Sequence, residues 1–351
     1  MSVALQAGLF ASGALLGGGV AYVAQRSSVR PVQEPISRVD TNSGASNVPI
    51  VTPTNANPVS LSPAPSVIPA APISDALALS GNPGPVDQLL QQQGYISSYD
   101  RRLRHPHWTA EHLTAASIQR KPGPDGANRA NSMFTEDARI SELFRSTNAA
   151  YFRSGYDRGH MVPAADVKSS QAAMNETFLL SNIAPQVGPG MNRDYWAHTE
   201  DFVRRLTTKF DDLYVFTIPL YLPRESSDGK WRVTYEVIGS PPSVSVPTHF
   251  AKVILGTGLK ATESHSLLNK TGLSHSSPVA LGAFVMPNSM IPDSAPLRSF
   301  ETDVESIERA SGLELFPAAI KRSARKLCDT VKCEIIIRDF SNASKQLLNK
   351  K

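Results

Sequence analysis

The sequence predicts an α+β fold in which helices flank a central antiparallel sheet. Runs rich in β-branched or aromatic residues, each bounded by turn residues, predict strands. These runs are Leu213 to Tyr221, Trp231 to Ile238, His249 to Leu255, Val279 to Pro287 and Cys333 to Phe340. Only two segments have a helical pattern, and helices and strands do not strictly alternate as they do around a parallel sheet. The sheet is therefore expected to be antiparallel.

The two helical segments are predicted from the spacing of their apolar residues and from residues that favour the start or end of a helix. Within Asn192 to Phe210, apolar residues recur at helical spacing, namely Tyr195, Phe202, Leu206 and Phe210. Trp196 on the same segment is expected in the core. The second helix is predicted over Pro296 to Leu313, because proline is favoured in a first helical turn and Gly312 marks an end. The polar stretch Lys260 to Pro278 is interpreted as an insertion between two strands.

The N-terminal part is expected to lie outside the folded domain. Val3 to Ala24 carries no charge, and a helix of that length is about 33 Å long, enough to cross a hydrocarbon core. Residues 1–24 are thus predicted to be a membrane anchor, favoured over a cleaved targeting sequence. Residues 25–85 are rich in Pro, Ser, Asn and Val, which predicts a disordered linker. The folded domain is placed at 86–341 and a basic tail at 342–351.

Charge and cysteine content narrow the function only slightly. Lys and Arg number 35 against 31 Asp and Glu, a net charge of +4 that is compatible with a polyanionic partner without identifying one. Cys328 and Cys333 have no second cysteine pair or nearby histidine, which argues against a structural zinc site. Buried or reduced thiols are the favoured interpretation, and a local disulfide is the alternative.

One stretch combines several reactive side chains. Tyr156 to Asp166, YDRGHMVPAAD, contains Asp157, Arg158 and His160 around a glycine. Such a stretch by itself is more often a salt-bridged turn. Downstream, however, TFLLSNIAPQ ends at Gln186, and NRDYWAHTEDFVRRL feeds a predicted helix from a Gly-Pro-Gly loop. The accumulation of Asn, Gln, Arg and Glu after the histidine favours an active site.

In this order and spacing, the three motifs resemble the DNA/RNA non-specific endonucleases of the ββα-metal (His-Me finger) superfamily, most closely the endonuclease G type. The resemblance covers about residues 86–341 and implies a ββα-metal nuclease fold. It makes His160 the general base and Asn192 the protein ligand of a Mg²⁺ or Mn²⁺ ion otherwise held by water. The residues implied in phosphate binding or support of the site are Arg158, Asn182, Gln186, Glu200 and Arg204.

Elementary chemistry agrees with these roles. Histidine titrates near neutral pH, and the charge of Arg158 would hold His160 neutral and able to accept a proton. Mg²⁺ needs only one or two protein oxygens, so Asn192 suffices if Glu200, two turns further along the helix, holds the metal waters. For Arg204, a helix-surface ion pair with Glu200 is an equally good interpretation.

The resemblance implies a membrane-tethered mitochondrial endonuclease that hydrolyses DNA and RNA with little sequence preference and leaves 5′-phosphate ends. Its implied partners are DNA, RNA, a membrane contacted by the N-terminal segment, and a second copy of the chain. The implied location is the mitochondrial inner membrane or intermembrane space. Two alternatives remain: a 5′ exonuclease of the same fold, and a catalytically idle nucleic-acid-binding module.

Three further histidines are set aside. His105, His107 and His112 have neither the helical spacing of a zinc pair nor a cysteine partner. A strand and its turn are expected there instead of a metal cluster.

Overall fold

The structure is a computed structural model that describes residues 85–120, 126–260 and 279–338. The predicted anchor, nearly all of the linker, the polar insertion after Lys260 and the basic tail lie outside the described residues. Within the described ranges, no helix is both long and apolar enough to cross a membrane.

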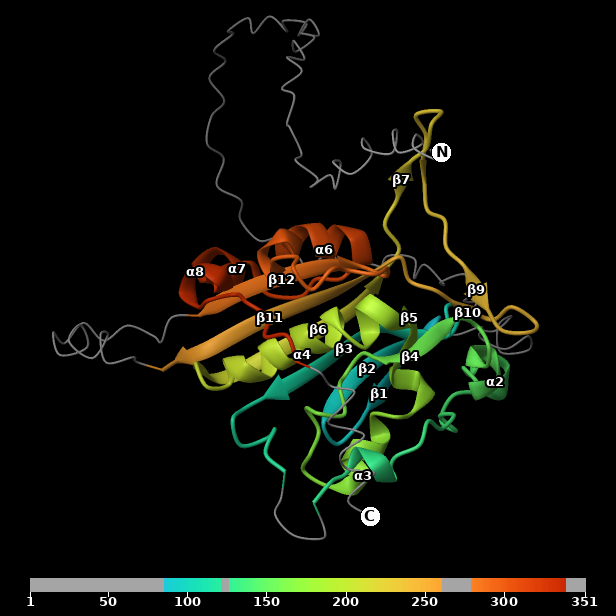
Figure 1. Ribbon diagram of the computed structural model, residues 1–351, viewed down its shortest axis with the longest axis horizontal. Helices are drawn as coiled ribbons and strands as arrows, with labels where there is room; N and C mark the ends of the chain where they lie inside the picture. Colours follow the sequence, from blue (N-terminus) through green and yellow to red (C-terminus); the bar gives the residue numbers. More distant parts are fainter. Residues whose placement is uncertain (1–84, 121–125, 261–278, 339–351) are drawn as a thin grey trace, which may run out of the picture. The chain divides into compact units, whose positions relative to one another are not determined.

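A central sheet organises the domain (Figure 1). Seven strands follow the order β1-β2-β3-β6-β11-β12-β13 with antiparallel pairing throughout, and β14 adds in parallel to β12. Their bounds are β1 Asp87–Gln91, β2 Tyr95–Asp100, β3 His105–Leu113, β6 Phe210–Leu220, β11 His249–Leu259, β12 Ala280–Pro287, β13 Glu301–Thr302 and β14 Arg325–Lys326. The predicted α+β class with a central antiparallel sheet is confirmed.

Three two-stranded ribbons lie outside this sheet. They pair β4 (Tyr156–His160) with β5 (Ile183–Val187), β7 (Arg224–Glu225) with β8 (Trp231–Arg232), and β9 (Val237–Ile238) with β10 (Val244–Ser245). The continuous strand predicted from Trp231 to Ile238 is wrong, since only its two ends pair. It forms part of an arm that projects from the sheet in Figure 1. Ile238 at its end is buried in a hydrophobic cluster, whereas Trp231, Val233, Tyr235 and Val237 are exposed.

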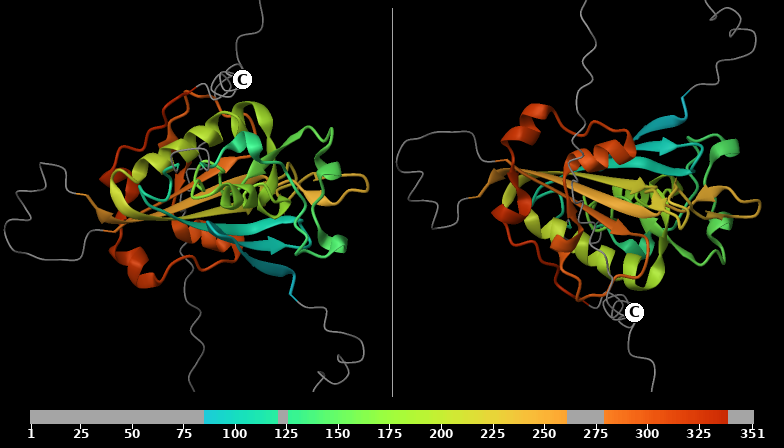
Figure 2. Two further views of the ribbon diagram at one scale, coloured as in Figure 1. Left: turned by 90° about the horizontal axis from the view of Figure 1, so that it is seen from below. Right: turned by 90° about the horizontal axis from the view of Figure 1, so that it is seen from above.

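Helices cover both faces of the sheet. In Figure 2, α4 lies on one face while α6 and α7 lie on the other. The helices are α2 Asn148–Tyr151, α3 Gln171–Glu176, α4 Tyr195–Leu206, α6 Val304–Ser311, α7 Ala318–Ser323 and α8 Leu327–Thr330. Short helical turns are η1 Arg129–Asn131, η2 Glu142–Phe144, η3 Leu180–Asn182, η4 Gly188–Asn192 and η5 Leu297–Phe300. The helix layer on each face closes a separate hydrophobic cluster over the sheet.

Helix α4 follows the predicted apolar pattern but is shorter than predicted. Its residues Tyr195, Phe202 and Leu206 are buried, as is Trp196, which confirms Trp196 as a core residue. The predicted extension to Phe210 is wrong. The helix ends at Leu206, and Phe210 pairs with Leu259 as the first residue of β6.

Helix α6 begins later than predicted. Its start is set by Asp303, whose carboxylate accepts a hydrogen bond from the Ser306 amide, and not by Pro296. The preceding residues form η5 and the short strand β13 because the sheet edge offers them a partner in β12. Its end at Gly312 is confirmed, since that residue has φ of +75°.

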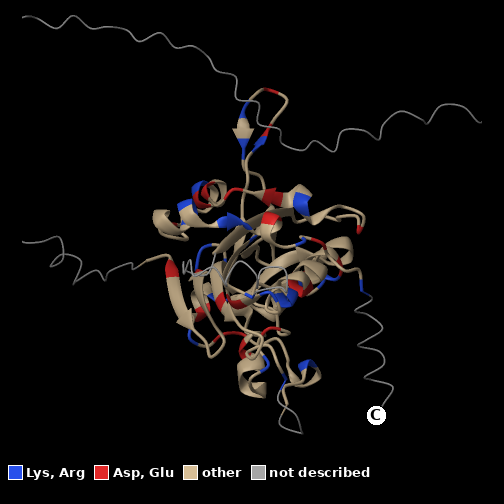
Figure 3. Cartoon of the chain, turned by 90° about the vertical axis from the view of Figure 1, so that its left-hand side faces the viewer, with Lys and Arg blue, Asp and Glu red and all other residues tan. Residues whose placement is uncertain are grey.

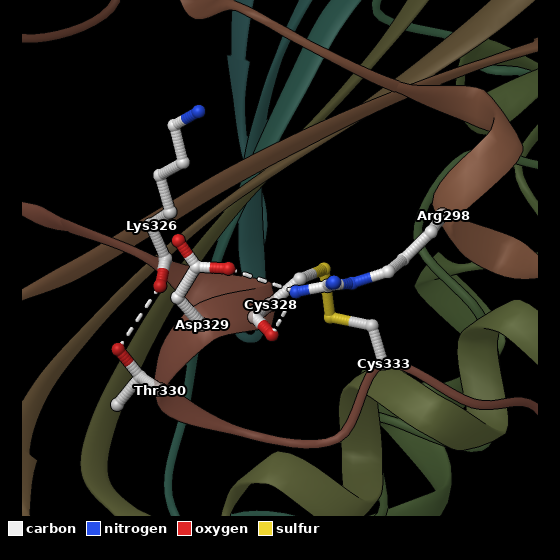
Figure 4. Close-up of a disulfide and its surroundings, with 6 residues drawn as sticks. All are labelled: Arg298, Lys326, Cys328, Asp329, Thr330 and Cys333. Carbon is white, nitrogen blue, oxygen red and sulfur yellow. Dashed lines mark hydrogen bonds and ion pairs between the residues drawn. A yellow bond between two sulfur atoms is a disulfide. The ribbon is translucent and has the colours of Figure 1, made fainter.

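Cys328 and Cys333 form a disulfide (Figure 4). The favoured interpretation as reduced thiols is therefore wrong, and the alternative is right. Arg298 donates hydrogen bonds to the Cys328 carbonyl and to the Asp329 carboxylate beside the bridge. Both cysteines pack into the main hydrophobic cluster under α4. The two cysteines are only five residues apart in the sequence, and the chain between them turns back, so their sulfur atoms meet.

The strand predicted over Cys333 to Phe340 is also wrong for its described part, because residues 333–338 pair with no other strand. Arg205 of α4 donates to the Glu334 carbonyl, and Ile336 and Ile337 are exposed. A β-branched run needs a sheet edge to bury it, and here the chain instead runs beside α4.

The three histidines lie on β3, which confirms the expected strand, and each has its own partner. His105 contacts the Tyr221 hydroxyl, His107 contacts Asp87, and His112 contacts Asp212. Across the described residues, no group of three or more His, Cys, Asp or Glu side chains could hold a metal ion.

Candidate active site

The β4–β5 ribbon carries His160 at its end, where His160 pairs with Ile183. One step back in the register, Gly159 pairs with Ala184, and the side chain of Gln186, which is fully buried, lies against Gly159. A Cβ atom on Gly159 would overlap the Gln186 amide. Gln186 thus fills the space beside Gly159, and only glycine permits that close approach.

His160 lies in an aromatic pocket with 7% of its surface exposed. Its ring centroid is 5.3 Å from that of Phe134 and 4.7 Å from that of Phe178. Its Nε2 atom is buried and has no hydrogen-bond partner among the described residues. Burial, reinforced by the charges of Arg129 and Arg158, lowers the pKa of His160 well below its ordinary value. At neutral pH the imidazole is an uncharged base.

Two arginines cover the rings that flank His160. The guanidinium carbon of Arg158 lies 4.3 Å from the Phe134 centroid, and its Nη1 donates to the Asn148 side chain at 2.7 Å. The guanidinium carbon of Arg129 lies 5.3 Å from the Phe178 centroid. Sequence reasoning identified Arg158 but missed Arg129. Nothing in the sequence marks it, because it enters from a separate loop outside the three motifs.

Asn182 holds the backbone that follows His160. Its Oδ1 accepts from the Val162 amide at 3.0 Å, and its Nδ2 donates to the carbonyls of Val162 and Thr177 at 2.9 and 2.8 Å. The side chain is fully buried. Its amide is thereby occupied by protein backbone, so Asn182 shapes the site from within the core.

Asn192 is tied to the histidine ribbon through Asp157. Its Nδ2 donates to Asp157 Oδ2 at 2.9 Å, and Arg193 binds the same carboxylate at 2.7 and 2.6 Å. Partial burial of Asp157 opposes its ionisation, but the bonds from Arg193 and Asn192 prevail and lower its pKa. Its nitrogen is engaged, whereas its amide oxygen accepts no hydrogen bond from the part of the chain that the structure describes.

That oxygen suits a hard cation. Mg²⁺ and Mn²⁺ prefer oxygen ligands, and Mg²⁺ keeps several waters when only one or two come from protein. The donor set therefore fits a metal held mainly by water and substrate.

Glu200 and Arg204 lie on α4 as a second group. Arg204 donates to Asp166 at 2.8 Å, and the two side chains are 14% and 1% exposed. Arg204 is thus part of a buried ion pair with Asp166, rather than the exposed helix-surface pair with Glu200 considered from the sequence. Burial raises the pKa of Glu200 to about 7, although the charges of Lys252 and Arg204 oppose this rise.

Arg129 links the two groups electrostatically, because its charge acts on both His160 and Glu200. The predicted residues thus form a ribbon group, with Arg158, His160, Gln186 and Asn192, and a helix group, with Glu200 and Arg204. Asn182 lies below the ribbon. In the view of Figure 3, Lys and Arg are interspersed with Asp and Glu along the described chain. Arg129 and Arg158 are the arginines whose charges act on His160.

Comparison with known proteins gives one consistent result. The profile of the family described as DNA/RNA non-specific endonuclease matches residues 73–321. The chain is 46% identical over 265 residues to the "Mitochondrial nuclease" of Saccharomyces cerevisiae, covering 75% of this chain and 76% of that one. It is 40% identical over 247 residues to "Endonuclease G, mitochondrial" of Homo sapiens, covering 70% and 75%.

A solved structure is similar as well. A chain from the crystal structure of the EndoG/EndoGI complex, described as showing the mechanism of EndoG inhibition, superposes with a TM-score of 0.61 at 41% identity. The match covers 73% of this chain and 97% of that chain. Sequence and fold therefore agree on the same relatives.

Proposed function

Because the chain belongs to the DNA/RNA non-specific endonuclease family and is a nucleic-acid-hydrolysing enzyme, we propose that it is a metal-dependent mitochondrial endonuclease. It hydrolyses phosphodiester bonds in DNA and RNA with little sequence preference and leaves 5′-phosphate ends. The observation that carries this proposal is the buried, neutral His160 between two arginines, on a ribbon joined through Asp157 to Asn192.

His160 acts as the general base. Its lowered pKa keeps the ring uncharged at neutral pH, and Nε2 is not engaged by any described residue. It removes a proton from the attacking water as the water approaches phosphorus. A positioned base contributes about 10² to 10⁴ in rate, so charge stabilisation by other groups must supply the rest.

Asn192 and Glu200 would hold the metal. Asn192 would supply an amide oxygen as a direct ligand, and Glu200, when ionised, would accept hydrogen bonds from water bound to the metal. A bound Mg²⁺ or Mn²⁺ ion supplies Lewis-acid stabilisation of charge on the phosphate and on the departing 3′ oxygen. Asp157 keeps the Asn192 amide in one orientation throughout.

The exposed Arg158 binds a phosphate of the substrate, and Arg129 has the same chemistry on the other side of His160. Arg204 supports the site through Asp166. Phosphate contacts carry no sequence information. A site that binds its substrate through phosphate groups is therefore expected to cleave with little preference for base sequence.

Digestion of circular plasmid and of RNA, with Mg²⁺, with Mn²⁺ and with EDTA, tests the activity. Wild-type protein should nick the plasmid with either metal and be inactive in EDTA, whereas His160→Ala should bind DNA without cleaving it. Cleavage of linear DNA alone would support the exonuclease alternative. Salt-sensitive binding with no hydrolysis under either metal would support an idle binding module.

We propose a mitochondrial location at the inner membrane or intermembrane space, with residues 1–24 as the anchor. Support comes from the uncharged Val3 to Ala24 segment and from the relatives named mitochondrial. The domain limits 25–85, 86–341 and 342–351 stay part of this proposal. Fractionation of cells expressing a tagged chain, with and without residues 1–24, tests it.

We further propose a homodimer. The projecting arm carries an apolar row, with Trp231 67%, Val233 47%, Tyr235 40% and Val237 43% exposed. Contiguous exposed apolar side chains on a soluble domain mark an interaction surface, and a second copy of the chain is the partner implied by the family resemblance.

A further inference from the structure

A cavity of about 450 Å³ lies beside the histidine ribbon, between the start of β4 and the projecting arm that contains β7 and β8 (Figure 1). The residues that line it include Tyr156 of β4, Asn288 after β12, and Arg224, Arg232 and Tyr235 of the arm. Its volume falls within the range of about 300 to 1,000 Å³ that is usual for ligand sites. The mechanism proposed above uses none of these five side chains.

The cavity and the general base share one face of β4. Successive side chains of a strand alternate between its two faces, so Tyr156, Arg158 and His160 point the same way. Arg158 and His160 both contact the Phe134 ring, and Phe134 and Tyr156 pack against the same hydrophobic cluster. Along the strand, Tyr156 and His160 are about 14 Å apart. This distance corresponds to about four steps of one DNA strand in a duplex, at roughly 3.4 Å per step.

Asn288 ties the wall of the cavity to this ribbon. Its Oδ1 accepts from the Val187 amide at 2.8 Å, and its Nδ2 donates to the carbonyls of Pro185 and Pro247 at 3.1 and 2.9 Å. Val187 pairs with Tyr156 across the ribbon. A ligand in the cavity would therefore be held at a set position relative to the strand that carries the general base.

Two arginines of the cavity wall face each other. Arg224 and Arg232 are directly opposite in the β7–β8 pairing, a placement in which like charges repel. Arg232 is neutralised by Asp228, whose two carboxylate oxygens each accept from it at 2.7 Å. No carboxylate in the part of the chain that the structure describes forms an ion pair with Arg224. Arg224 is therefore the cation that an anionic ligand would neutralise.

Tyr156 adds an aromatic surface to this cation. Among the described residues that line the cavity, Glu236 is the only carboxylate, and the two arginines outnumber it. Burial, followed by the Glu236 carboxylate, raises the pKa of Tyr156 above its ordinary value, so the ring is uncharged at neutral pH and does not repel a phosphate. Arginine beside an aromatic ring is the combination with which proteins bind phosphate and base of a nucleic-acid strand.

We propose that this cavity binds a nucleotide of the substrate strand about four nucleotides from the bond that is cleaved, with its phosphate on Arg224 and its base against Tyr156. The inference rests on the proposed function for the identity of the strand, although its binding can be measured without cleavage. Phosphate contacts and base stacking tolerate any sequence. The cavity thus adds affinity for longer strands without adding base preference.

Cleavage kinetics with substrates of two lengths test this site in the full-length protein. Arg224→Gln should lower kcat/KM about tenfold for a strand of about ten nucleotides, mainly through KM, because one charge-assisted phosphate contact is lost. It should leave kcat/KM for a dinucleotide unchanged, since a dinucleotide cannot span both sites. Arg224→Lys keeps the charge and should retain most of the activity on the longer strand. Equal losses at both lengths, or no loss with the longer strand, would overturn the proposal.

Arg322→Gln is the matched control. Arg322 is an exposed arginine of α7, which lies on the face of the sheet opposite α4 (Figure 2). The control should leave both substrates unaffected, and a loss similar to that of Arg224→Gln would count against a specific contact.

The oligomeric state of Arg224→Gln is measured beside its kinetics, because Tyr235 lines the cavity and also belongs to the apolar row of the proposed dimer. The variant should keep the oligomeric state of the wild type in light scattering coupled to size exclusion. Conversion to a monomer with unaltered affinity for the longer strand would assign the cavity to a second copy of the chain and overturn the proposal.

Photocrosslinking locates the strand without any turnover. The full-length His160→Ala protein is irradiated with a strand of about ten nucleotides in which iodouracil replaces thymine, and mass spectrometry identifies the modified residues. Tyr156 should be crosslinked, and Arg224→Gln in the same background should reduce the yield there. Absence of a crosslink at Tyr156 overturns the inference even if the wild-type enzyme cleaves DNA. A crosslink that depends on Arg224 supports the inference even if the plasmid assay shows no cleavage.

Discussion

Asp157 joins the histidine ribbon to Asn192: its carboxylate accepts from the Asn192 amide nitrogen at 2.9 Å while also binding Arg193. Asp157, three positions before His160 in the motif, thus fixes a side chain from a separate segment of the chain. This contact sets the orientation of the amide oxygen that we assign to the metal.

Asp157→Asn should weaken metal use without unfolding the domain. The substitution keeps the shape but loses the charge that holds Arg193 and the Asn192 amide. Replacing a residue that hydrogen-bonds to a metal ligand, and so orients it, typically lowers metal affinity or activity by about 10- to 100-fold. A Mg²⁺ titration of plasmid cleavage should shift to higher concentrations by a factor in that range. Asp228→Asn, which breaks a comparable pair with Arg232 on the arm, should leave the titration unchanged.

Gly159→Ala should destabilise the protein and reduce activity, because the new methyl group overlaps the Gln186 side chain. Overpacking of this kind costs about 1 to 3 kcal/mol in the free energy of unfolding. Urea unfolding measures it. In a Gln186→Ala background the same substitution should cost much less, and equal costs in the two backgrounds would contradict the close approach of Gly159 and Gln186.

The free energy of unfolding should depend on the ionisation of Glu200. Its folded pKa of about 7 lies above the ordinary value of 4.5, so the stability it contributes is fully present below pH 4.5 and is lost as the pH rises through 7. Glu200→Gln should therefore be more stable than wild type at pH 8.5, by on the order of 2 kcal/mol, and lose most of this advantage at pH 5. Parallel denaturation curves of the two proteins at both pH values measure the difference.

Loss of the Cys328–Cys333 bridge should lower stability modestly. Closing so short a loop contributes about 2 kcal/mol in the chain-entropy description. Cys328→Ser with Cys333→Ser should show this loss in urea, and a reducing agent should produce it in wild type but not in the variant. Alkylation of the unreduced protein followed by mass measurement gives the direct check, since two modified cysteines would mean that no disulfide forms.

The arm should control the oligomeric state. Trp231→Ser with Val233→Ser removes half of the apolar row and should convert a dimer to a monomer in light scattering coupled to size exclusion. Leu143→Ser, at another exposed apolar side chain (69% exposed), serves as the control and should stay dimeric. A dimer that persists in the arm variant would place the contact elsewhere.

The sequence by itself determined the features that depend on local order. Apolar periodicity placed α4 and buried Trp196, the β-branched runs gave β6, β11 and β12, and Gly312 ended α6. The three motifs identified the family, because reactive residues at fixed spacing survive as a recognisable pattern. The roles of His160 and Asn192 stay predictions that the described geometry supports.

Only the tertiary structure decided what depends on which surfaces meet. The run after Trp231 is not a continuous strand because no sheet edge receives it, and Arg204 is paired because Asp166 arrives from another segment. Tertiary packing also decided that Arg129 lies over the ring of Phe178 and that Lys252 lies near the ring of Trp196 on α4. Local patterns record periodicity, whereas the partner of a charge, and therefore its ionisation, is fixed only when distant segments pack together.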